Sequence, residues 1–416
     1  MKQYILALVT ILSLFNSADI HASVAASDVY RVTTIAPFPR GLVIKDGKLY
    51  VLCRGRVRGV GGVTAEVEDQ AGTIYAVNPN VTEPISTYEV SDAVRHNGEI
   101  LALPTSPPFN LWDRTSNPPS RDRYTDRPYC TLRYHEGTKS FYLCAFSGVD
   151  KMKTATDKVA FSKNLTDAVL RYDLRTRKWS EVERHKIEAG GNYPHHDPRY
   201  NPPPHGWLNG ADNCLPLGNT LYAVAKDNTV LISYDLTALA KDPDAPAPPS
   251  RLELSKMVPM ADGSTRELYG FSALAYHKGW LYIACRTSSV IFRLRLDEQY
   301  QLTRPIAAEV VATFKPYDPA TGKSANITDM DIDDQGRLYV INAKPSRVYR
   351  FTPDPANPFD GQKEEPWADM ATLTHNQSMK SENVLYHDGW LYVTSGDGYS
   401  YQAGANGTVY RVAVND

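Results

Sequence analysis

Short apolar and aromatic runs recur along the chain, and each follows a polar step and a glycine. Four close copies of this phrase are Asp46-Gly47-Lys48-Leu49-Tyr50, Lys278-Gly279-Trp280-Leu281-Tyr282, Gln335-Gly336-Arg337-Leu338-Tyr339 and Asp388-Gly389-Trp390-Leu391-Tyr392. Two looser copies lead from Gly137 to Tyr142 and from Gly218 to Tyr222. Apolar β-branched and aromatic runs bounded by Gly or Asp-Gly turns predict antiparallel β-hairpins.

The distance between successive copies indicates how the hairpins are grouped. The marker glycines are 90, 81, 61, 57 and 53 residues apart. A core unit of roughly 50 to 60 residues is typical of a propeller blade. We therefore count six blades, and we place the surplus residues of the first two intervals in insertions near 97–129 and 190–207. In the first blade, the expected strands cover 41–44, 49–52, 73–77 and 85–90.

The two ends of the chain complement each other. The last unit stops one strand short, whereas residues 29–35 form a strand-like run with no blade of its own. Pairing the two closes the ring and removes two exposed sheet edges. The predicted fold is therefore all-β, a six-bladed β-propeller whose last blade takes its outer strand from the N-terminus.

The first residues are typical of an export signal. Lys2 precedes an apolar run over 5–15, and Ala22, Ala25 and Ala26 offer cleavage sites. We expect a signal peptide over 1–26, with an uncleaved anchor as the alternative, and one propeller domain over 27–416. No later run is long enough to cross a bilayer. We therefore expect a secreted or periplasmic monomer.

Charge and cysteine content narrow the class further. The formal charge of −2 gives no reason to expect a nucleic-acid partner. Five cysteines are an odd number, which does not indicate a disulfide-dense scaffold. Cys130 and Cys144 lie opposite each other if a hairpin turns at Gly137, and both a disulfide and two free thiols are compatible with that placement.

The starts of the innermost strands of a propeller meet around its central channel, and pockets form where loops converge there. We call the tyrosine that ends each repeated phrase its marker Tyr. The residues ten positions before five of these tyrosines are Arg40, Asp212, Ser272, Asp329 and Glu382. Together with Asn213, the three carboxylates suit a hard cation that prefers oxygen ligands. The predicted metal ligands are thus Asp212, Asn213, Asp329 and Glu382, and calcium is favoured over zinc. The alternative is a set of ion pairs that tie blades together.

Cationic and imidazole side chains supply the other half of the predicted site. Loops after the second strands contain Arg54, Arg286 and Lys344. With Arg40 they predict an anionic ligand, because guanidinium groups pair with carboxylate or phosphate; solvated loop charges are the alternative. His195 and His205, in the second insertion, match no tight metal motif and are assigned to substrate binding or to a polar lid.

Two blade openings resemble a known group of propellers. Asn209-Gly210-Ala211-Asp212 and Asp329-Met330-Asp331-Ile332-Asp333 are similar to the blade openings of the NHL and gluconolactonase-like (senescence marker protein) group. That resemblance implies a lactone hydrolase with a divalent cation held by Glu, Asn and Asp at the channel mouth. This sequence has Arg40 where an acidic ligand is expected and Phe271 where the group has Asp, and Asn209 is one residue off register.

These observations lead to one functional hypothesis and one alternative. The hypothesis is a metal-assisted hydrolase of lactonase or esterase type, acting on a small polar or anionic, sugar-derived molecule in the central channel. Asp212, Asp329 and Glu382 are its predicted catalytic residues, and Arg40, Arg54, Arg286, Lys344, His195 and His205 its predicted substrate-binding residues. The alternative is a propeller that binds a ligand or a protein without catalysis, since fold alone does not choose between them.

Overall fold

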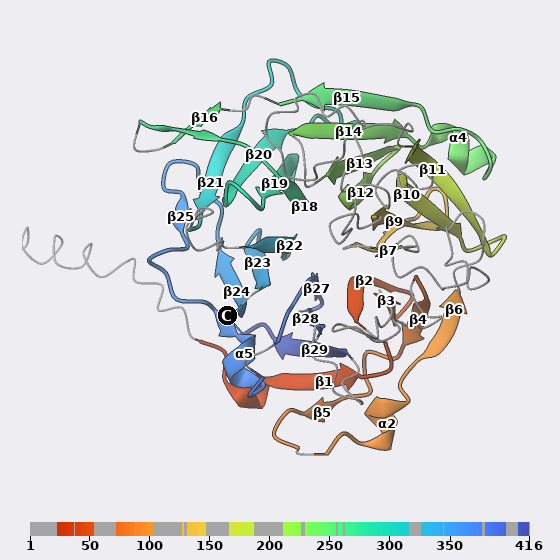
Figure 1. The fold of residues 1–416 in the computed structure, drawn as a ribbon, viewed down its shortest axis with the longest axis vertical. Coiled ribbons are helices and arrows are strands. Elements are labelled where there is room, and N and C mark those ends of the chain that lie inside the picture. Colours follow the sequence, from red (N-terminus) through yellow and green to blue (C-terminus); the bar gives the residue numbers. More distant parts are fainter. Residues whose placement is uncertain are drawn as a thin grey trace, which may run out of the picture.

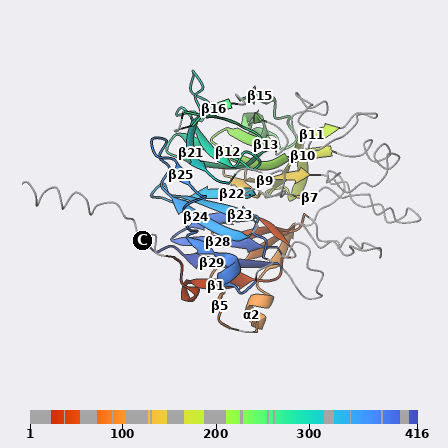
Figure 2. The same ribbon diagram turned by 60° about the vertical axis from the view of Figure 1, so that its left-hand side comes forward.

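Six β-sheets of four or five strands each stand around a central axis in the computed structural model (Figure 1). The structure describes residues 23–36, 38–53, 72–87, 89–102, 127–128, 131–146, 166–186, 211–225, 229–254, 257–260, 263–315, 326–343, 345–376, 379–396 and 407–415. A view turned by 60° shows the sheets side by side in one body (Figure 2). The predicted six-bladed β-propeller is therefore confirmed.

The first three blades follow one another along the chain. Blade 1 contains β2 (Pro39–Lys45), β3 (Lys48–Cys53), β4 (Ile74–Val77) and β6 (Glu99–Ala102). Blade 2 contains β8 (Arg133–His135), β9 (Ser140–Phe146), β10 (Thr166–Asp173) and β11 (Lys178–Lys186), and β7 (Arg127–Pro128) also pairs with β9. Blade 3 contains β12 (Ala211–Leu217), β13 (Thr220–Ala225), β14 (Val230–Asp235) and β15 (Pro249–Glu253).

The remaining blades complete the ring. Blade 4 contains β18 (Phe271–His277), β19 (Trp280–Cys285), β20 (Val290–Arg295) and β21 (Glu309–Thr313), with β25 (Phe359–Asp360) parallel to β21. Blade 5 contains β22 (Ile327–Ile332), β23 (Leu338–Ala343), β24 (Ser346–Phe351) and β26 (Ala368–Asp369). Blade 6 contains β27 (Val384–His387), β28 (Trp390–Ser395), β29 (Thr408–Ala413) and β1 (Val29–Thr33), with β5 (Glu83–Pro84) beyond β1.

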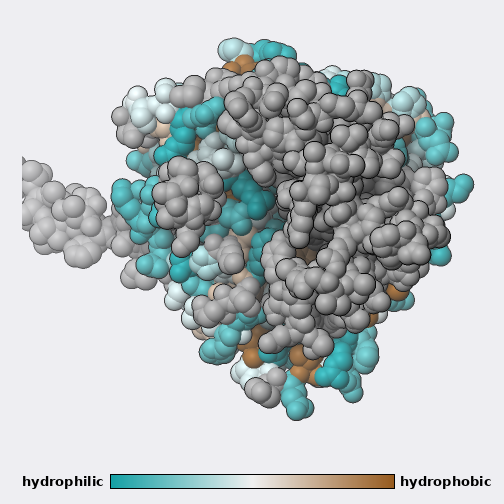
Figure 3. Space-filling view, in the orientation of Figure 1, coloured by the Kyte–Doolittle hydropathy of each residue, from teal (hydrophilic) through white to brown (hydrophobic). Residues whose placement is uncertain are grey.

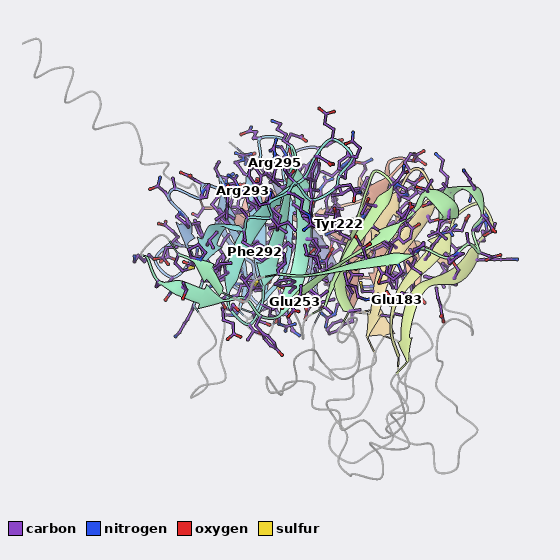
Figure 4. The ribbon with its side chains drawn as sticks, turned by 90° about the horizontal axis from the view of Figure 1, so that it is seen from above. Glu183, Tyr222, Glu253, Phe292, Arg293 and Arg295 are labelled. Carbon is purple, nitrogen blue, oxygen red and sulfur yellow. The ribbon has the colours of Figure 1, made fainter. Side chains whose placement is uncertain are left out.

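Few named helices and strands of the described residues lie outside the blades. β16 (Met257–Pro259) and β17 (Thr265–Glu267) form a separate hairpin. The helical segments are η1 (Ala26–Asp28), α2 (Asp92–Arg95), α4 (Thr237–Lys241) and α5 (Met370–Leu373). In the edge-on view of Figure 4, Arg293 and Arg295 lie toward one face of the body and Glu183 toward the other. None of the helices in the described part of the chain is long and apolar enough to cross a membrane.

The N-terminal strand closes the ring as predicted. β1 pairs antiparallel with β29, with Val29 opposite Val412 and Arg31 opposite Tyr410. Most of the predicted signal peptide lies outside the described residues. Its last part contacts the propeller, because the Val24 amide donates a hydrogen bond of 3.1 Å to the Trp367 carbonyl.

The outer strand of blade 1 differs from the prediction. The fourth strand is β6, which comes after the predicted strand over 85–90 and lies within the first predicted insertion. Asn97 explains this choice, because its buried amide donates to the carbonyls of Val32 (2.7 Å) and Asn78 (2.9 Å). These bonds join the start of β6 to blade 6. The sequence signal for 85–90 was apolar content alone, which does not fix a partner strand.

Six apolar clusters form the core, and each lies between two neighbouring blades. Leu42 and Val51 of blade 1, for example, share one cluster with Tyr392 and Val409 of blade 6. The other five clusters join the remaining neighbours in turn. Every blade thus buries both faces. This leaves the inner strand starts, which lie at the axis, as the place where polar side chains gather.

The cysteines have a packing role where the structure describes them. Cys53 and Cys285 occupy equivalent inner positions and are fully buried. Cys144 is also buried. Cys130 lies outside the described residues, so its pairing with Cys144 stays a prediction.

A histidine links blades 2 and 3 on the hairpin-turn side. His135 Nε2 lies 2.5 Å from the Gly218 carbonyl, which only accepts, so Nε2 carries the proton. Nδ1 then accepts from the Thr138 amide at 3.3 Å. Burial lowers the pKa of His135 from its ordinary 6.5, and the Gly218 bond opposes this in part.

This arrangement predicts a pH-dependent loss of stability. Because the folded pKa is lowered, the stabilisation is complete above the unfolded pKa of about 6.5 and is lost as the pH falls through the folded value. His135→Gln should make the loss in unfolding free energy between about pH 7 and pH 5 smaller than in the wild type, because glutamine does not take up a proton in this range. Urea unfolding at both pH values measures it. His387→Gln, which replaces a side chain that is 44 % exposed, is the control. An equal effect in both variants would contradict the assignment.

Candidate active site at the propeller axis

The inner strands start with a repeated irregularity that brings polar side chains to the axis. In β2, the pairs Pro39–Cys53 and Gly41–Leu52 leave Arg40 as an extra residue, which is a β-bulge. The same shift leaves Asp212 extra in β12 and Ser272 extra in β18. The predicted residues Arg40, Asp212, Asn213, Asp329 and Glu382 are all at most 1 % exposed. Figure 3 shows hydrophilic residues in a recess near the centre of one face.

Turn length shifts the register in blade 5. The β2–β3 turn has two residues between Lys45 and Lys48, whereas the β22–β23 turn spans 333–337. The extra residue of β22 is therefore Thr328, and Asp329 lies one position further along, at the level of Asn213. A fixed offset of ten residues from the marker Tyr was wrong for this blade. Asp329 still faces the axis, as its contacts show.

Glu382 lies two residues before β27 and is surrounded by cations. Its carboxylate forms an ion pair with Arg40 of blade 1, and its Oε1 lies 2.5 Å from Lys380 Nζ. Burial alone raises the pKa of a carboxyl group. Here the positive charges of Arg40, Lys380 and Arg286 outweigh burial and lower the pKa of Glu382 to about 2. Glu382 is therefore ionised at neutral pH, and Arg286, a predicted ligand-binding residue, lies within reach of its field.

Asp329 is held by three other blades. Its Oδ1 accepts from Asn213 Nδ2 of blade 3 at 3.1 Å, and its Oδ2 accepts from the Val384 amide of blade 6 at 3.1 Å and from the Asn383 side chain. Arg133 Nη2 of blade 2 lies 3.5 Å from Oδ1. Blades 2 and 5 are opposite each other in the ring, so this contact crosses the axis. Side chains of three blades thus converge on the carboxyl group of a fourth.

Burial gives Asp329 the opposite protonation behaviour to Glu382. Burial, helped by the charge of Asp331, raises the pKa of Asp329 to about 7, although Arg133 and the Val384 amide oppose the rise. Two buried carboxyl groups near the axis therefore differ widely in pKa. Such a difference is typical of sites where one group stays ionised and the other exchanges a proton near neutral pH.

Arg133 and Asp331 belong to the site but were missed in the sequence. Arg133 pairs with Tyr142 and Asp331 pairs with Tyr339, the marker Tyr of its own blade in each case. The two residues therefore occupy equivalent positions on the inner strands of their blades. Asp331 accepts from the Tyr386 amide at 2.7 Å, and burial raises its pKa. The available signal was the two-residue period of a strand, which places Asp331 on the same face as Asp329. In blade 2, the four-residue turn over 136–139 concealed the register.

The described residues do not fit the predicted cation site. Both oxygens of Glu382 face cationic side chains, and both oxygens of Asp329 accept hydrogen bonds. Arg40 lies where the gluconolactonase-like resemblance places an acidic ligand, and it neutralises Glu382 itself. Within the described ranges, no group of three or more His, Cys, Asp or Glu side chains could hold a metal ion.

Four predicted site residues lie outside the described residues: Arg54, Lys344, His195 and His205. Their roles stay predictions. Arg286 follows β19, and its amide donates a 2.7 Å hydrogen bond to the Gly270 carbonyl, which fixes the start of its loop beside blade 4. Asp212 is fully buried at the bulge of β12.

Comparisons with known proteins find solved structures that are similar to this chain over most of its length. No protein-family model and no curated protein matches the chain. It is similar to a luciferin-regenerating enzyme (12 % identity, TM-score 0.37, 92 % of this chain and 94 % of that one). It is also similar to regucalcin from Agrobacterium tumefaciens, described as a calcium-binding protein (11 %, 0.41, 92 % of each chain), and to virginiamycin B lyase from Staphylococcus aureus (10 %, 0.41, 93 % and 98 %).

These likenesses carry no argument about activity, because every TM-score is below 0.5 and every identity is 12 % or less. The expected resemblance holds for the six-bladed propeller architecture, which the strand pairing establishes independently. What the chain does has to be argued from its own axial residues.

Proposed function

We propose that this propeller is a hydrolase of lactonase or esterase type, which binds a small anionic molecule at the axis and exchanges a proton with it through Asp329. One observation carries the proposal: side chains of three other blades converge on the buried carboxyl group of Asp329, and one of them, Asn383, directly follows Glu382, which is paired with Arg40. In line with these surroundings, the pKa values of the two carboxyl groups shift in opposite directions, to about 7 and about 2. A group whose pKa lies near the working pH serves best as general acid or base.

The local charges support an anionic ligand. Arg40, Lys380 and Arg286 all act on the single ionised carboxylate of Glu382. Three positive charges around one negative charge attract a further anion, and guanidinium groups bind carboxylate or phosphate oxygens in pairs. Glu382 has the supporting role of holding Arg40 in place.

The reaction follows from these roles. Ionised Asp329 takes a proton from a water molecule while the water oxygen bonds to the acyl carbon of the substrate. The bond from that carbon to the alkoxy oxygen then breaks, and protonated Asp329 returns the proton to this oxygen. The products are a carboxylic acid and an alcohol, which remain one molecule when the substrate is a lactone. Export through the predicted signal peptide would place this chemistry outside the cytoplasm.

Hydrolysis of a panel of lactones and aryl esters, with and without a second anionic group, tests the proposal. We expect turnover of at least one anionic member, with a pH profile that changes near pH 7 because ionised Asp329 is needed. Asp329→Asn should abolish it. A chain that turns over none of them but binds their anionic products, measured by calorimetry, would favour the non-catalytic alternative. The observation that favours this alternative is that both oxygens of Asp329 already accept hydrogen bonds.

Divalent cations provide a separate test, because the resemblance implies calcium, whereas cationic side chains already surround the Glu382 carboxylate. We expect millimolar calcium or EDTA to leave the melting temperature within about 1 °C, since no charge at Glu382 remains for an ion to balance. Differential scanning calorimetry measures it. A rise of several degrees with calcium that is lost in Asp329→Asn would establish the predicted cation site instead.

A further inference from the structure

An aromatic residue beside Arg40 has an unusual backbone. Phe38 has a φ of 54°, in the left-handed region that bulky residues rarely occupy. Pro39 follows it, and a proline biases the preceding residue toward extended backbone. Two preferences are therefore overridden at one position. Conformations of this kind persist where the surroundings determine them, and they cluster at functional sites.

Blade 6 supplies those surroundings. A Cβ on Gly396 would lie 3.0 Å from the Phe38 ring, so the ring rests against this glycine. A Cβ on Gly407 would lie 2.1 Å from Pro39 Cδ and 2.9 Å from the Phe38 amide nitrogen. Gly396 follows β28 and Gly407 precedes β29. The segment before β2 is thus pressed between the ends of two strands of the neighbouring blade.

The strained conformation places the ring under the guanidinium of Arg40. The Arg40 Cζ lies 4.5 Å from the centroid of the Phe38 ring, within the range of a cation–π interaction. The same guanidinium forms the ion pair with Glu382. The Phe38 ring fixes the plane of the guanidinium, and Glu382 holds one of its edges. Two contacts therefore orient the Arg40 side chain. Gly396 also donates its amide to the Lys380 carbonyl at 2.8 Å, which joins the second cation of the site to the same contact.

We propose that Phe38 is a positioning residue for anion recognition: its ring, held by Gly396 in a strained backbone, sets the plane in which Arg40 meets a ligand carboxylate. The inference deepens the proposed function and rests on its anion-binding part. A residue that only filled space would need apolar volume, whereas a residue that orients a cation needs an aromatic face. The two roles therefore differ in which substitutions they tolerate.

Malonate and inorganic phosphate serve as probes, with affinity measured by calorimetry on the full chain. Phe38→Leu keeps apolar volume and removes the aromatic face, and we expect it to weaken malonate binding about tenfold. Phe38→Tyr keeps the face and should stay within about twofold of wild type. Trp280→Leu is the matched control, because it removes a ring from under Arg293 (3.9 Å) next to the β18–β19 hairpin turn of blade 4. It should leave affinity unchanged.

Gly396→Ala guards against misfolding of the Phe38 variants. The three atoms nearest to the added methyl group all belong to the Phe38 ring, at 3.0–3.1 Å, so the ring has to move by a few tenths of an ångström. Binding should weaken while the melting temperature falls by no more than a few degrees. Unchanged affinity in both Phe38→Leu and Gly396→Ala would overturn the inference and leave the anion site standing. A wild-type chain that binds neither probe would overturn the anion site and the inference with it, whereas the hydrolysis panel tests Asp329 separately.

Discussion

Replacement of Arg40 by methionine is expected to reduce the free energy of unfolding by about 3–5 kcal/mol, because it leaves a buried charge without its main partner. Arg40 and Glu382 are 0 % and 1 % exposed, and they join blade 1 to blade 6 where the ring closes. Methionine preserves apolar volume, so the loss reports on the charge. Urea unfolding near neutral pH measures it.

The pH dependence of this effect separates charge from packing. The folded pKa of Glu382 is about 2 and its ordinary value is 4.5, so the stabilisation is present above about pH 4.5 and is lost as the pH falls toward 2. The deficit of Arg40→Met should therefore shrink in acid. Arg95→Met is the control, since its pair with Asp92 is 52 % and 83 % exposed and exposed pairs contribute at most about 1 kcal/mol. Equal small losses in both variants would contradict the account.

Asp329→Asn is expected to reduce hydrolysis at least about 100-fold, because an amide cannot exchange the proton. It should also change how stability depends on pH. The folded pKa of about 7 lies above the ordinary 3.8, so the folded state retains a proton that the unfolded state releases. Stability contributed by this group is present below about pH 3.8 and is lost as the pH rises through 7. The variant should lack that decline.

Asp333→Asn provides the comparison within the same blade. Asp333 is buried, but it accepts from the Arg337 amide (2.8 Å) and from Tyr339 Oη (3.1 Å) in the turn between β22 and β23, away from the axis. Its replacement should lower the melting temperature and leave the turnover number within about twofold. Rate measurements and calorimetry on both variants separate the two roles. Full activity in Asp329→Asn would refute its assignment as the proton-exchanging group.

The fold was readable from the sequence because its signals are local and repeated. Each tight hairpin needs two residues of positive φ, and Asp46-Gly47 (50° and 71°) and Asp388-Gly389 (47° and 76°) supply them. Ring closure followed from one strand missing at one end and one in excess at the other. The error at 85–90 arose because the choice of β6 depends on Asn97, whose partners are 65 and 19 residues away in the sequence.

The site was predicted less completely, for a geometric reason. Residues at inner strand starts meet at the axis in any propeller, which was enough to select Arg40, Asp212, Asp329 and Glu382. Which of them touch depends on turn lengths, and these moved Asp329 by one position and concealed Arg133. The partners of Glu382 favour an anionic ligand over the expected metal ion. A carboxylate predicted to bind a metal ion has guanidinium and ammonium groups around it.

A double-mutant cycle between Arg133 and Asp329 tests most directly whether distant segments meet at the axis. The two residues belong to opposite blades and are joined by a 3.5 Å contact. Urea unfolding of wild type, Arg133→Gln, Asp329→Asn and the double variant near pH 8, where Asp329 is largely ionised, gives their coupling energy. We predict a coupling of about 1 kcal/mol or more, whereas losses that add to within about 0.5 kcal/mol would contradict the convergence on which the proposed site depends.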